Sequence, residues 1–377
     1  MPKVRKYILS LDGGGFRGLS CLIILSQLMR GLVEGDPDEE PIPSPCQIFD
    51  LICGTSTGGL IAILLGRLGL DCSTAISIYK KLGPSVFGRD EGKIWGNIIK
   101  GERFSSTAFE TLLTEIVKNY TGDENALMKV QKSKPDAVEH GSTDTFVTVV
   151  PAGVGSAGTE AYRLRTYAVP RDGFESAPPG HSWTIRQAAR ATSAAPMYFA
   201  PLQIESQAFQ DAAASGFNNP TLEALQEAEL RWPTRQHEFV IISLGTGLCS
   251  LLPDDFDDQP VANPDDKAFD KVVNNLRNKF KNITTAKARF EQVAKQLVSV
   301  ATDTELTHGE AAKRFKKWKR SENYFRFNPP QGLGDIDLAD YMNEGTIIEI
   351  TNVWLRSDDG KFSTSDARAK LQAAYNV

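Results

Sequence analysis

Two short apolar runs, each ending in a glycine-rich turn that leads into a helix, constrain the fold of this chain most. Residues 7–11 form the first run, and helical spacing of leucines follows over residues 18–32. Residues 48–53 form the second run, which leads through the turn 54–59 into an apolar helix start at 60–65. This order favours a mostly parallel sheet with helices on both faces.

Later segments repeat the alternation. Helices are predicted over residues 106–120 and 184–193, a long helical region over 269–320 and a terminal helix near 365–374, with strands at 145–150, 161–169, 239–244 and 324–327. We therefore expect a three-layer α/β fold with a helical C-terminal extension. The 377 residues are predicted to form one domain, with a core at about 5–250 and a mainly helical extension at about 267–377.

Composition limits the partners and the compartment. Hydrophobic residues make up 41% of the chain and the net charge is only −5, which excludes wholesale disorder and gives no basic field for nucleic acid. The five cysteines are widely spaced with no zinc-binding pattern, which predicts reduced thiols, no metal and a cytoplasmic protein. No apolar run reaches the roughly 18 residues of a membrane span, so any membrane contact is expected to be peripheral.

The second turn carries a candidate nucleophile. Residues 54–58 read Gly-Thr-Ser-Thr-Gly and match G-x-S-x-G between a predicted strand and a predicted helix. Glycines at both ends allow a sharp turn that holds the Ser56 hydroxyl at the helix N-terminus, where negative charge is favoured. A purely structural turn is the alternative interpretation.

The first turn, residues 12–18, has two interpretations. Its glycines fit G-x-G-x-x-G, a dinucleotide-binding pattern, but that site also needs an acidic residue at the end of a second strand. Glu34 and Asp36 fall at a helix end and in a proline-rich loop, so the requirement fails. We prefer a loop of backbone amides that can converge on an oxyanion, with a simple steric turn as the remaining alternative.

A serine nucleophile needs a base, and the chain has four histidines. His237 follows Ser56 in the order that α/β-hydrolases use, but it precedes the strand at 239–244 and so lies at the wrong edge of the sheet. The others are more typical of surface positions than of a catalytic site: His140, His181 and His308.

Asp211 is better placed to act as the base. It follows the apolar Phe209 and opens a turn of small residues. Because a carboxylate of ordinary pKa near 4 is a poor base for a hydroxyl, the role requires burial that raises the pKa. An aspartate that only caps the turn is the alternative.

These segments together resemble the patatin-like phospholipase family. Residues 12–18 resemble the family's D-G-G-G-x-[KR]-G loop, residues 54–58 its G-x-S-x-G elbow, and Asp211 begins a segment similar to its D-G-[GA] motif. Further matching pieces are residues 191–196, 218–220 and 243–247, all in the family's order. The resemblance spans about residues 7–247 and implies a patatin-like fold.

The resemblance also implies an activity: a Ca²⁺-independent lipid acyl hydrolase of the phospholipase A type, without cofactor, that acts on lipid at a membrane surface. Ser56 would attack the ester carbonyl and Asp211 would take its proton. The oxyanion would be held by Gly13, Gly14 and Gly15, with Arg17 and Thr57 in supporting roles.

One residue departs from the family pattern, because Ala212 stands where a glycine is expected after the catalytic aspartate. If that position needs a positive φ, alanine costs on the order of 1 kcal/mol and shifts the carboxylate. This motivates a second hypothesis, a catalytically weak patatin-like module with a signalling or effector role.

Two further segments have open interpretations. Residues 313–320 place six basic side chains around Phe315 and Trp318, which suits either an anionic lipid surface or a solvated helix face with two buried aromatics. The loop at 83–104, with Phe87 and Trp95, either borders the acyl site or only plugs the core.

Overall fold

The computed structural model of the chain describes residues 3–33, 35, 40–87, 104–130, 141–152, 160–168, 182–196, 198–247, 304–329, 332–334, 336 and 339–376. Several sequence predictions fall outside these residues: His140, His181, most of the loop predicted at 83–104 and the part of the helical region 269–320 before residue 304. Residues 83–87, which were predicted to belong to that loop, lie instead in a helix that ends at Phe87.

One mixed sheet forms the centre of the fold. Its strands run in the order β5-β6-β3-β2-β1-β7-β8, and β4 pairs with β3 beside this path. The pairs from β3 through β2, β1 and β7 to β8 are parallel, and the pairs among β3, β4, β5 and β6 are antiparallel. The strands are β1 (Val4–Leu11), β2 (Leu51–Thr55), β3 (Asp144–Pro151), β4 (Tyr162–Arg165), β5 (Leu202–Ile204), β6 (Gln207–Asp211), β7 (His237–Leu244) and β8 (Tyr324–Phe327).

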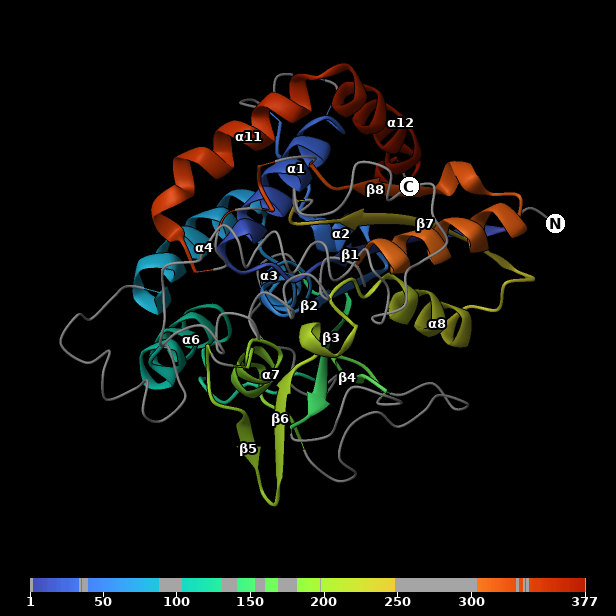
Figure 1. Cartoon of the computed structure of the whole chain (residues 1–377). Coiled ribbons are helices and arrows are strands. Elements are labelled where there is room, and N and C mark those ends of the chain that lie inside the picture. The colour runs from blue at the N-terminus through green and yellow to red at the C-terminus, as the bar shows by residue number, and fades with distance from the viewer. Residues whose placement is uncertain are drawn as a thin grey trace, which may run out of the picture.

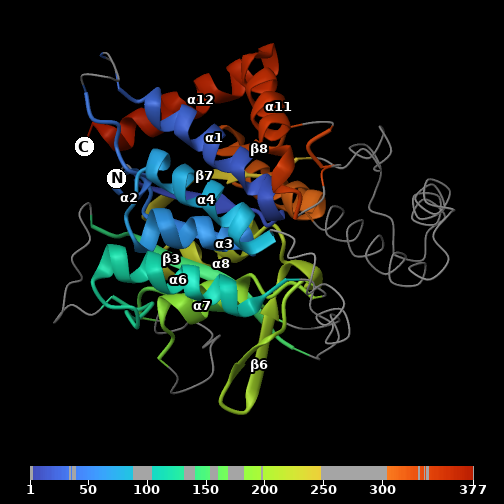
Figure 2. The same cartoon turned by 90° about the vertical axis from the view of Figure 1, so that its left-hand side faces the viewer.

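Helices cover both faces of the sheet, which confirms the three-layer prediction (Figure 1). Helix α8 and a helix at residues 304–317 lie on one face, and the others pack in the larger core on the opposite face, where Figure 2 shows several of them stacked. The labelled helices are α1 (Gly18–Arg30), α2 (Pro45–Ile48), α3 (Thr57–Ala62), α4 (Cys72–Phe87), α6 (Ser106–Thr121), α7 (Ile185–Thr192), α8 (Thr221–Arg231), α11 (Glu344–Arg356) and α12 (Asp358–Tyr375).

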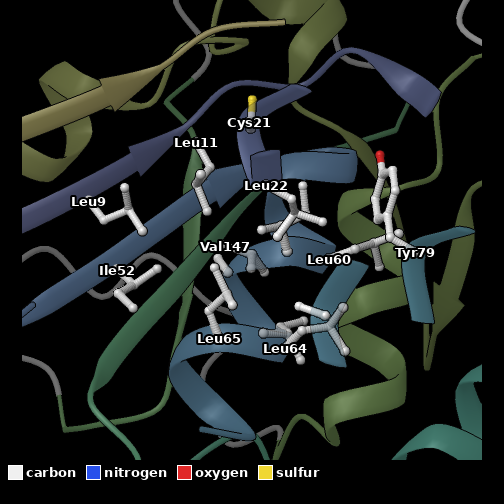
Figure 3. Packing of buried hydrophobic residues seen from close by; sticks show 14 of the residues in the cluster. Leu9, Leu11, Cys21, Leu22, Ile52, Leu60, Leu64, Leu65, Tyr79 and Val147 are labelled. Atoms are coloured by element: carbon white, nitrogen blue, oxygen red, sulfur yellow. The ribbon is translucent and has the colours of Figure 1, made fainter. Parts of the chain in front are cut away.

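Alternation along the central strands separates the two cores. In β1, Leu9 and Leu11 belong to the larger cluster and Ile8 belongs to the smaller one on the opposite face. In the larger cluster, Leu9 packs with neighbours such as Ile52 and Val147, as Figure 3 shows in close view. Because these side chains are removed from water, the parallel strands β1, β2 and β3 form a rigid base for the turns at their carboxyl ends.

The second strand starts later than predicted. Residues 45–48 form the short helix α2, because Pro45 occupies its first turn and Ser44 makes a capping box with Gln47. The apolar Ile48 therefore belongs to this helix, and β2 begins at Leu51. Its carboxyl end still leads directly into the Ser56 turn, as the sequence predicts.

The C-terminal part of the chain contributes to the sheet as well as to the helical layers. Strand β8 adds to β7 in parallel, with Ile241 opposite Tyr324. Helices α11 and α12 pack against α1 in the larger core. The division into a core at 5–250 and an extension at 267–377 stays a prediction.

Across the part of the chain that the structure describes, no helix is long and apolar enough to cross a membrane. Among the described cysteines, Cys21, Cys53 and Cys72 are buried and Cys46 is half-buried, and none of the four forms a disulfide bond.

Candidate active site

Ser56 lies on a strained turn between β2 and α3. Its backbone angles φ and ψ are 56° and −129°, a combination that residues other than glycine rarely adopt. The turn closes tightly, because a Cβ on Gly54 would overlap the Gly58 carbonyl and a Cβ on Gly58 would overlap the backbone at Asp12. The two glycines thus permit the elbow that presents Ser56 at the N-terminus of α3.

The end of α7 holds the elbow from the side. The Ser56 amide donates to Thr192 Oγ1 at 3.1 Å, and the Thr192 hydroxyl donates in turn to the Thr148 carbonyl at 2.9 Å. A single threonine therefore links the turn after β2 to strand β3.

The glycine-rich loop lies directly against the elbow. A Cβ on Gly13 would come within 2.8 Å of Ser56 Cβ, so the close approach requires glycine. The Gly13 amide already donates to the Asn218 carbonyl at 3.1 Å, and the Gly14 amide makes only a long 3.3 Å bond to Thr57 Oγ1. Of these two amides, that of Gly14 is the easier to redirect toward an oxyanion.

Side chains hold the carbonyl groups of the same loop. Arg17 Nε donates to the Gly14 carbonyl at 3.2 Å, and Arg17 Nη1 donates to the Gly334 carbonyl at 2.6 Å. The Tyr79 hydroxyl donates to the Gly15 carbonyl at 2.6 Å. Because the Gly14 carbonyl and the Gly15 N–H share one peptide group, Arg17 orients and polarises that N–H.

Asp211 ends strand β6, which runs antiparallel to β3. The hairpin of β5 and β6 projects past the other strands of the sheet (Figure 1), and β6 returns so that Asp211 lies opposite Val149. Since Thr148 pairs with Thr55, the carboxylate reaches the level of Ser56. Although β6 is antiparallel in a sheet that was predicted to be mostly parallel, its last residue therefore lies at the same end of the sheet as Ser56.

The Asp211 carboxyl is buried and only partly hydrogen-bonded. Its Oδ1 accepts from the Ala213 amide at 2.8 Å, whereas Oδ2 has no hydrogen-bond partner of ordinary geometry among the described residues. Burial raises the pKa of Asp211 to about 7, against the opposing effects of the Ser56 hydroxyl and the Ala213 amide. A carboxylate with this pKa is suited to accept a proton near neutral pH.

Ala212 adopts an ordinary right-handed conformation, with φ −76° and ψ −14°. The positive φ that would have strained an alanine occurs instead at Gly216, where φ is 91°. The structural reason to suspect a displaced Asp211 carboxylate therefore disappears.

We accordingly expect Ala212→Gly to leave kcat unchanged and to lower stability by about 1 kcal/mol, because glycine adds backbone entropy to the unfolded chain. Thermal unfolding and ester hydrolysis of the purified variant measure the two effects. A clear gain in kcat would contradict the conformation described here.

An apolar pocket opens beside Ser56. It encloses about 570 Å³ of space between atoms, open solvent included. Apolar side chains dominate its walls: Phe16, Leu60, Tyr79, Leu82, Phe109, Tyr198 and Phe199, with Ser56, Thr57 and Ser193 among the few hydroxyls. Such a lining is complementary to a hydrocarbon chain.

The two described histidines lie on other elements than Ser56 and Asp211. His237 begins β7 opposite Val4, at the N-terminal ends of these parallel strands and so at the opposite end from the Ser56 turn. His308 bonds to the Tyr324 hydroxyl at 3.0 Å, at the start of β8. Both side chains are half-buried, so they agree only in part with the prediction of surface histidines.

The basic segment 313–320 lies near the N-terminal ends of the parallel strands, whereas Ser56 follows the C-terminal end of β2. Phe315 is buried, Trp318 packs against Phe239, and Arg320 pairs with Glu238 at 3.3 Å. Of the two interpretations, this favours a solvated helix face with buried aromatics.

Among the described residues, no group of three or more His, Cys, Asp and Glu side chains is arranged to hold a metal ion.

The sequence did not predict that Thr192 contacts the Ser56 amide or that Asn218 contacts the glycine-rich loop, although both residues fall in segments that resemble family motifs. The only sequence signal for these two residues was that segments 191–196 and 218–220 match family motifs in the family's order.

The fold and the site together define an α/β protein with a serine elbow under a loop of backbone amides. The family model for patatin-like phospholipases matches residues 9–225, and the chain belongs to this family.

Curated relatives agree with this assignment. Phospholipase A I of Arabidopsis thaliana is 30% identical over 66% of this chain and 21% of its own length. Calcium-independent phospholipase A2-gamma is 31% identical in Mus musculus, over 85% of this chain and 34% of its own, and 30% identical in Homo sapiens, over 89% and 36%. The chain thus spans about a fifth to a third of the length of these relatives.

Proposed function

We propose that this chain is a Ca²⁺-independent lipid acyl hydrolase that cleaves fatty-acyl esters of membrane glycerolipids as a phospholipase A. The observation that carries the proposal is the strained Ser56 next to a buried Asp211, whose Oδ2 has no other hydrogen-bond partner among the described residues. The names of the relatives, phospholipase A I and calcium-independent phospholipase A2-gamma, support the substrate class.

In the first half-reaction, Ser56 Oγ attacks the ester carbonyl carbon while Asp211 accepts the hydroxyl proton. The developing oxyanion is stabilised by the Gly14 and Gly15 amides and by the N-terminus of α3. Gly13 shapes the loop, since its own amide donates to Asn218. Asp211 then returns the proton to the departing alkoxide, and the acyl group stays on Ser56.

In the second half-reaction, water takes the place of the departed alcohol. Asp211 removes a proton from this water, the new oxygen–carbon bond forms, and the bond to Ser56 Oγ breaks. Ser56 Oγ recovers its proton from Asp211, and the fatty acid leaves. One carboxylate of pKa near 7 serves as both base and acid in this scheme.

The pocket beside Ser56 is the proposed binding site of the acyl chain. Arg17 supports the loop through its bond to the Gly14 carbonyl, and Thr57, which accepts from the Gly14 amide, also lines the pocket. A cytoplasmic protein that meets the membrane only peripherally remains our prediction for location and partner.

The second hypothesis, a catalytically weak effector module, rested on Ala212 and loses that support because φ there is ordinary. The dinucleotide hypothesis requires free amides in the first turn, whereas the Gly13 amide donates to Asn218. Hydrolysis is therefore the function that the geometry favours.

Release of labelled fatty acid from phosphatidylcholine vesicles tests the proposal. We expect the wild-type chain to release fatty acid and lysophospholipid at the same rate with excess EGTA and with millimolar calcium. Absence of release in both conditions would contradict lipid hydrolysis, and release only with calcium would contradict calcium independence.

A further inference from the structure

A buried ion pair ties the glycine-rich loop to strand β8. Arg326 Nη2 lies 2.6 Å from Asp12 Oδ2, and Arg326 Nη1 lies 3.0 Å from Asp12 Oδ1. The side chains are only 6% and 1% exposed. Asp12 directly precedes the loop glycines, so this two-pronged contact fixes the point where the loop leaves β1.

The guanidinium is itself held by neighbours. Arg326 Nη1 also donates to Ser243 Oγ at 3.0 Å on β7, and Arg326 Nη2 lies 3.5 Å from Glu305. Glu305 in turn accepts from Asn328 Nδ2 at 3.0 Å. Ser243 and Glu305 therefore fix the position of the Arg326 guanidinium, so Arg326 does more than neutralise the Asp12 carboxylate.

A second contact ties the same loop to residue 304. Asn218 Nδ2 donates to the Gly13 carbonyl at 3.3 Å and to Thr304 Oγ1 at 3.0 Å. Thr246 Oγ1 donates to the Gly13 carbonyl as well, at 2.9 Å. Residues 304–329 thus hold the loop directly through Arg326 and Asp12 and indirectly through Thr304 and Asn218, although they lie beyond residue 225, where the family match ends.

The loop needs such support because glycines lose more backbone freedom on ordering than other residues do. Oxyanion stabilisation depends on amides that are already in place before the reaction. Gly13 touches Ser56 directly, so a displaced loop would disturb the nucleophile and the amides together. Removal of Arg326 would also leave the Asp12 carboxylate buried without its partner.

We propose that Arg326 is a positioning residue for the oxyanion loop, acting through Asp12, and that residues 304–329 complete the active site. This inference rests on the proposed acyl-hydrolase function. It assigns part of the catalytic machinery to a segment of the chain outside the family match.

The test uses four proteins of full length: wild type, Arg326→Lys, Arg326→Met and the double variant Asp12→Asn/Arg326→Met. We expect Arg326→Met to lower kcat by about tenfold to a hundredfold with KM changed less than about threefold, because the loop acts mainly on the transition state. Binding of an alkyl trifluoromethyl ketone, whose adduct with Ser56 carries an oxyanion, should weaken in parallel. Arg326→Lys should recover part of both losses.

The double variant separates positioning from stability. Since Asn and Met remove both charges of the buried pair, and the remaining Glu305 carboxylate, 16% exposed, still accepts from Asn328, its thermal midpoint should return toward wild type, while kcat and inhibitor affinity stay low. Its behaviour decides the question even if Arg326→Met alone does not fold. Return of kcat together with the thermal midpoint would overturn the proposal, and so would a folded Arg326→Met with kcat within twofold of wild type.

Arg165→Met is the matched control. Arg165 makes an equally buried pair with Glu227, with Nε and Oε1 2.7 Å apart, between β4 and α8, neither of which carries the loop. We expect it to lower the thermal midpoint but to preserve kcat and inhibitor affinity. Failure of the proposed function would look different, because the wild type itself would then show no Ser56-dependent hydrolysis.

Discussion

Ser56→Ala is expected to reduce ester hydrolysis at least about a thousandfold, to a level set by binding and by the remaining oxyanion donors. The reason is that the acyl-enzyme cannot form without this hydroxyl, which the strained elbow presents to Asp211. Hydrolysis of a p-nitrophenyl ester and of labelled phosphatidylcholine measures the loss.

Two further variants make this result specific. Ser365→Ala removes an exposed hydroxyl on α12 and should leave the rate unchanged. Ser56→Gly should be as inactive as Ser56→Ala but more stable, by about 1 kcal/mol, because glycine tolerates the φ of 56°. Hydrolysis that persists in Ser56→Ala would remove Ser56 from the mechanism.

Asp211→Asn is expected to lower kcat/KM by about a hundredfold or more, since the amide cannot accept the Ser56 proton. In the wild type, kcat/KM should rise with pH through about 7, the pKa of Asp211, because only the ionised carboxylate acts as base. A pH–rate profile of both proteins provides the measurement.

Asp211→Asn should lower activity but raise the free energy of unfolding at alkaline pH. Burial raises the folded-state pKa of Asp211 to about 7, so the folded protein binds a proton that the unfolded chain has released above about 4. The wild type therefore loses stability as pH rises from about 4 to 7, and Asp211→Asn does not. At pH 8 the variant should be more stable, by an amount on the order of 4 kcal/mol at most, while at pH 4 the two should be nearly equal.

Glu223→Gln is the control for these two effects. Burial also raises the pKa of Glu223, which lies on α8 and makes no contact with Ser56. It should gain stability at alkaline pH in the same direction and keep its activity. An Asp211→Asn variant that keeps the wild-type rate would exclude Asp211 as the base.

Much of the parallel half of the sheet could be predicted from the sequence. Buried parallel strands read as continuous apolar runs, and Gly54 and Gly58 announce the turn after β2 because no other residue fits there. The antiparallel edge was harder, since β5 and β6 are short and only partly apolar. The assignment of Asp211 as base rested on residue type and resemblance, not on strand direction.

Long-range polar contacts could not be predicted. Asp12 lies within a motif, but nothing local identifies a partner 314 residues away in β8. The conformation of Ala212 was likewise inaccessible, because a pattern of residue types does not state which glycine in a motif needs a positive φ. Ordinary φ at Ala212 and a positive φ at Gly216 emerge only from the folded turn.

Strand β8 also bears on where this chain can be divided. All six residues from Phe239 to Leu244 of β7 are buried, and β8 pairs along that stretch of the strand. A fragment that ended near residue 250 would present a long apolar edge with open N–H and C=O groups, a template for pairing between copies. Aggregation, rather than mere loss of turnover, is the expected fate of such a fragment, so a soluble piece of this protein has to extend past Phe327.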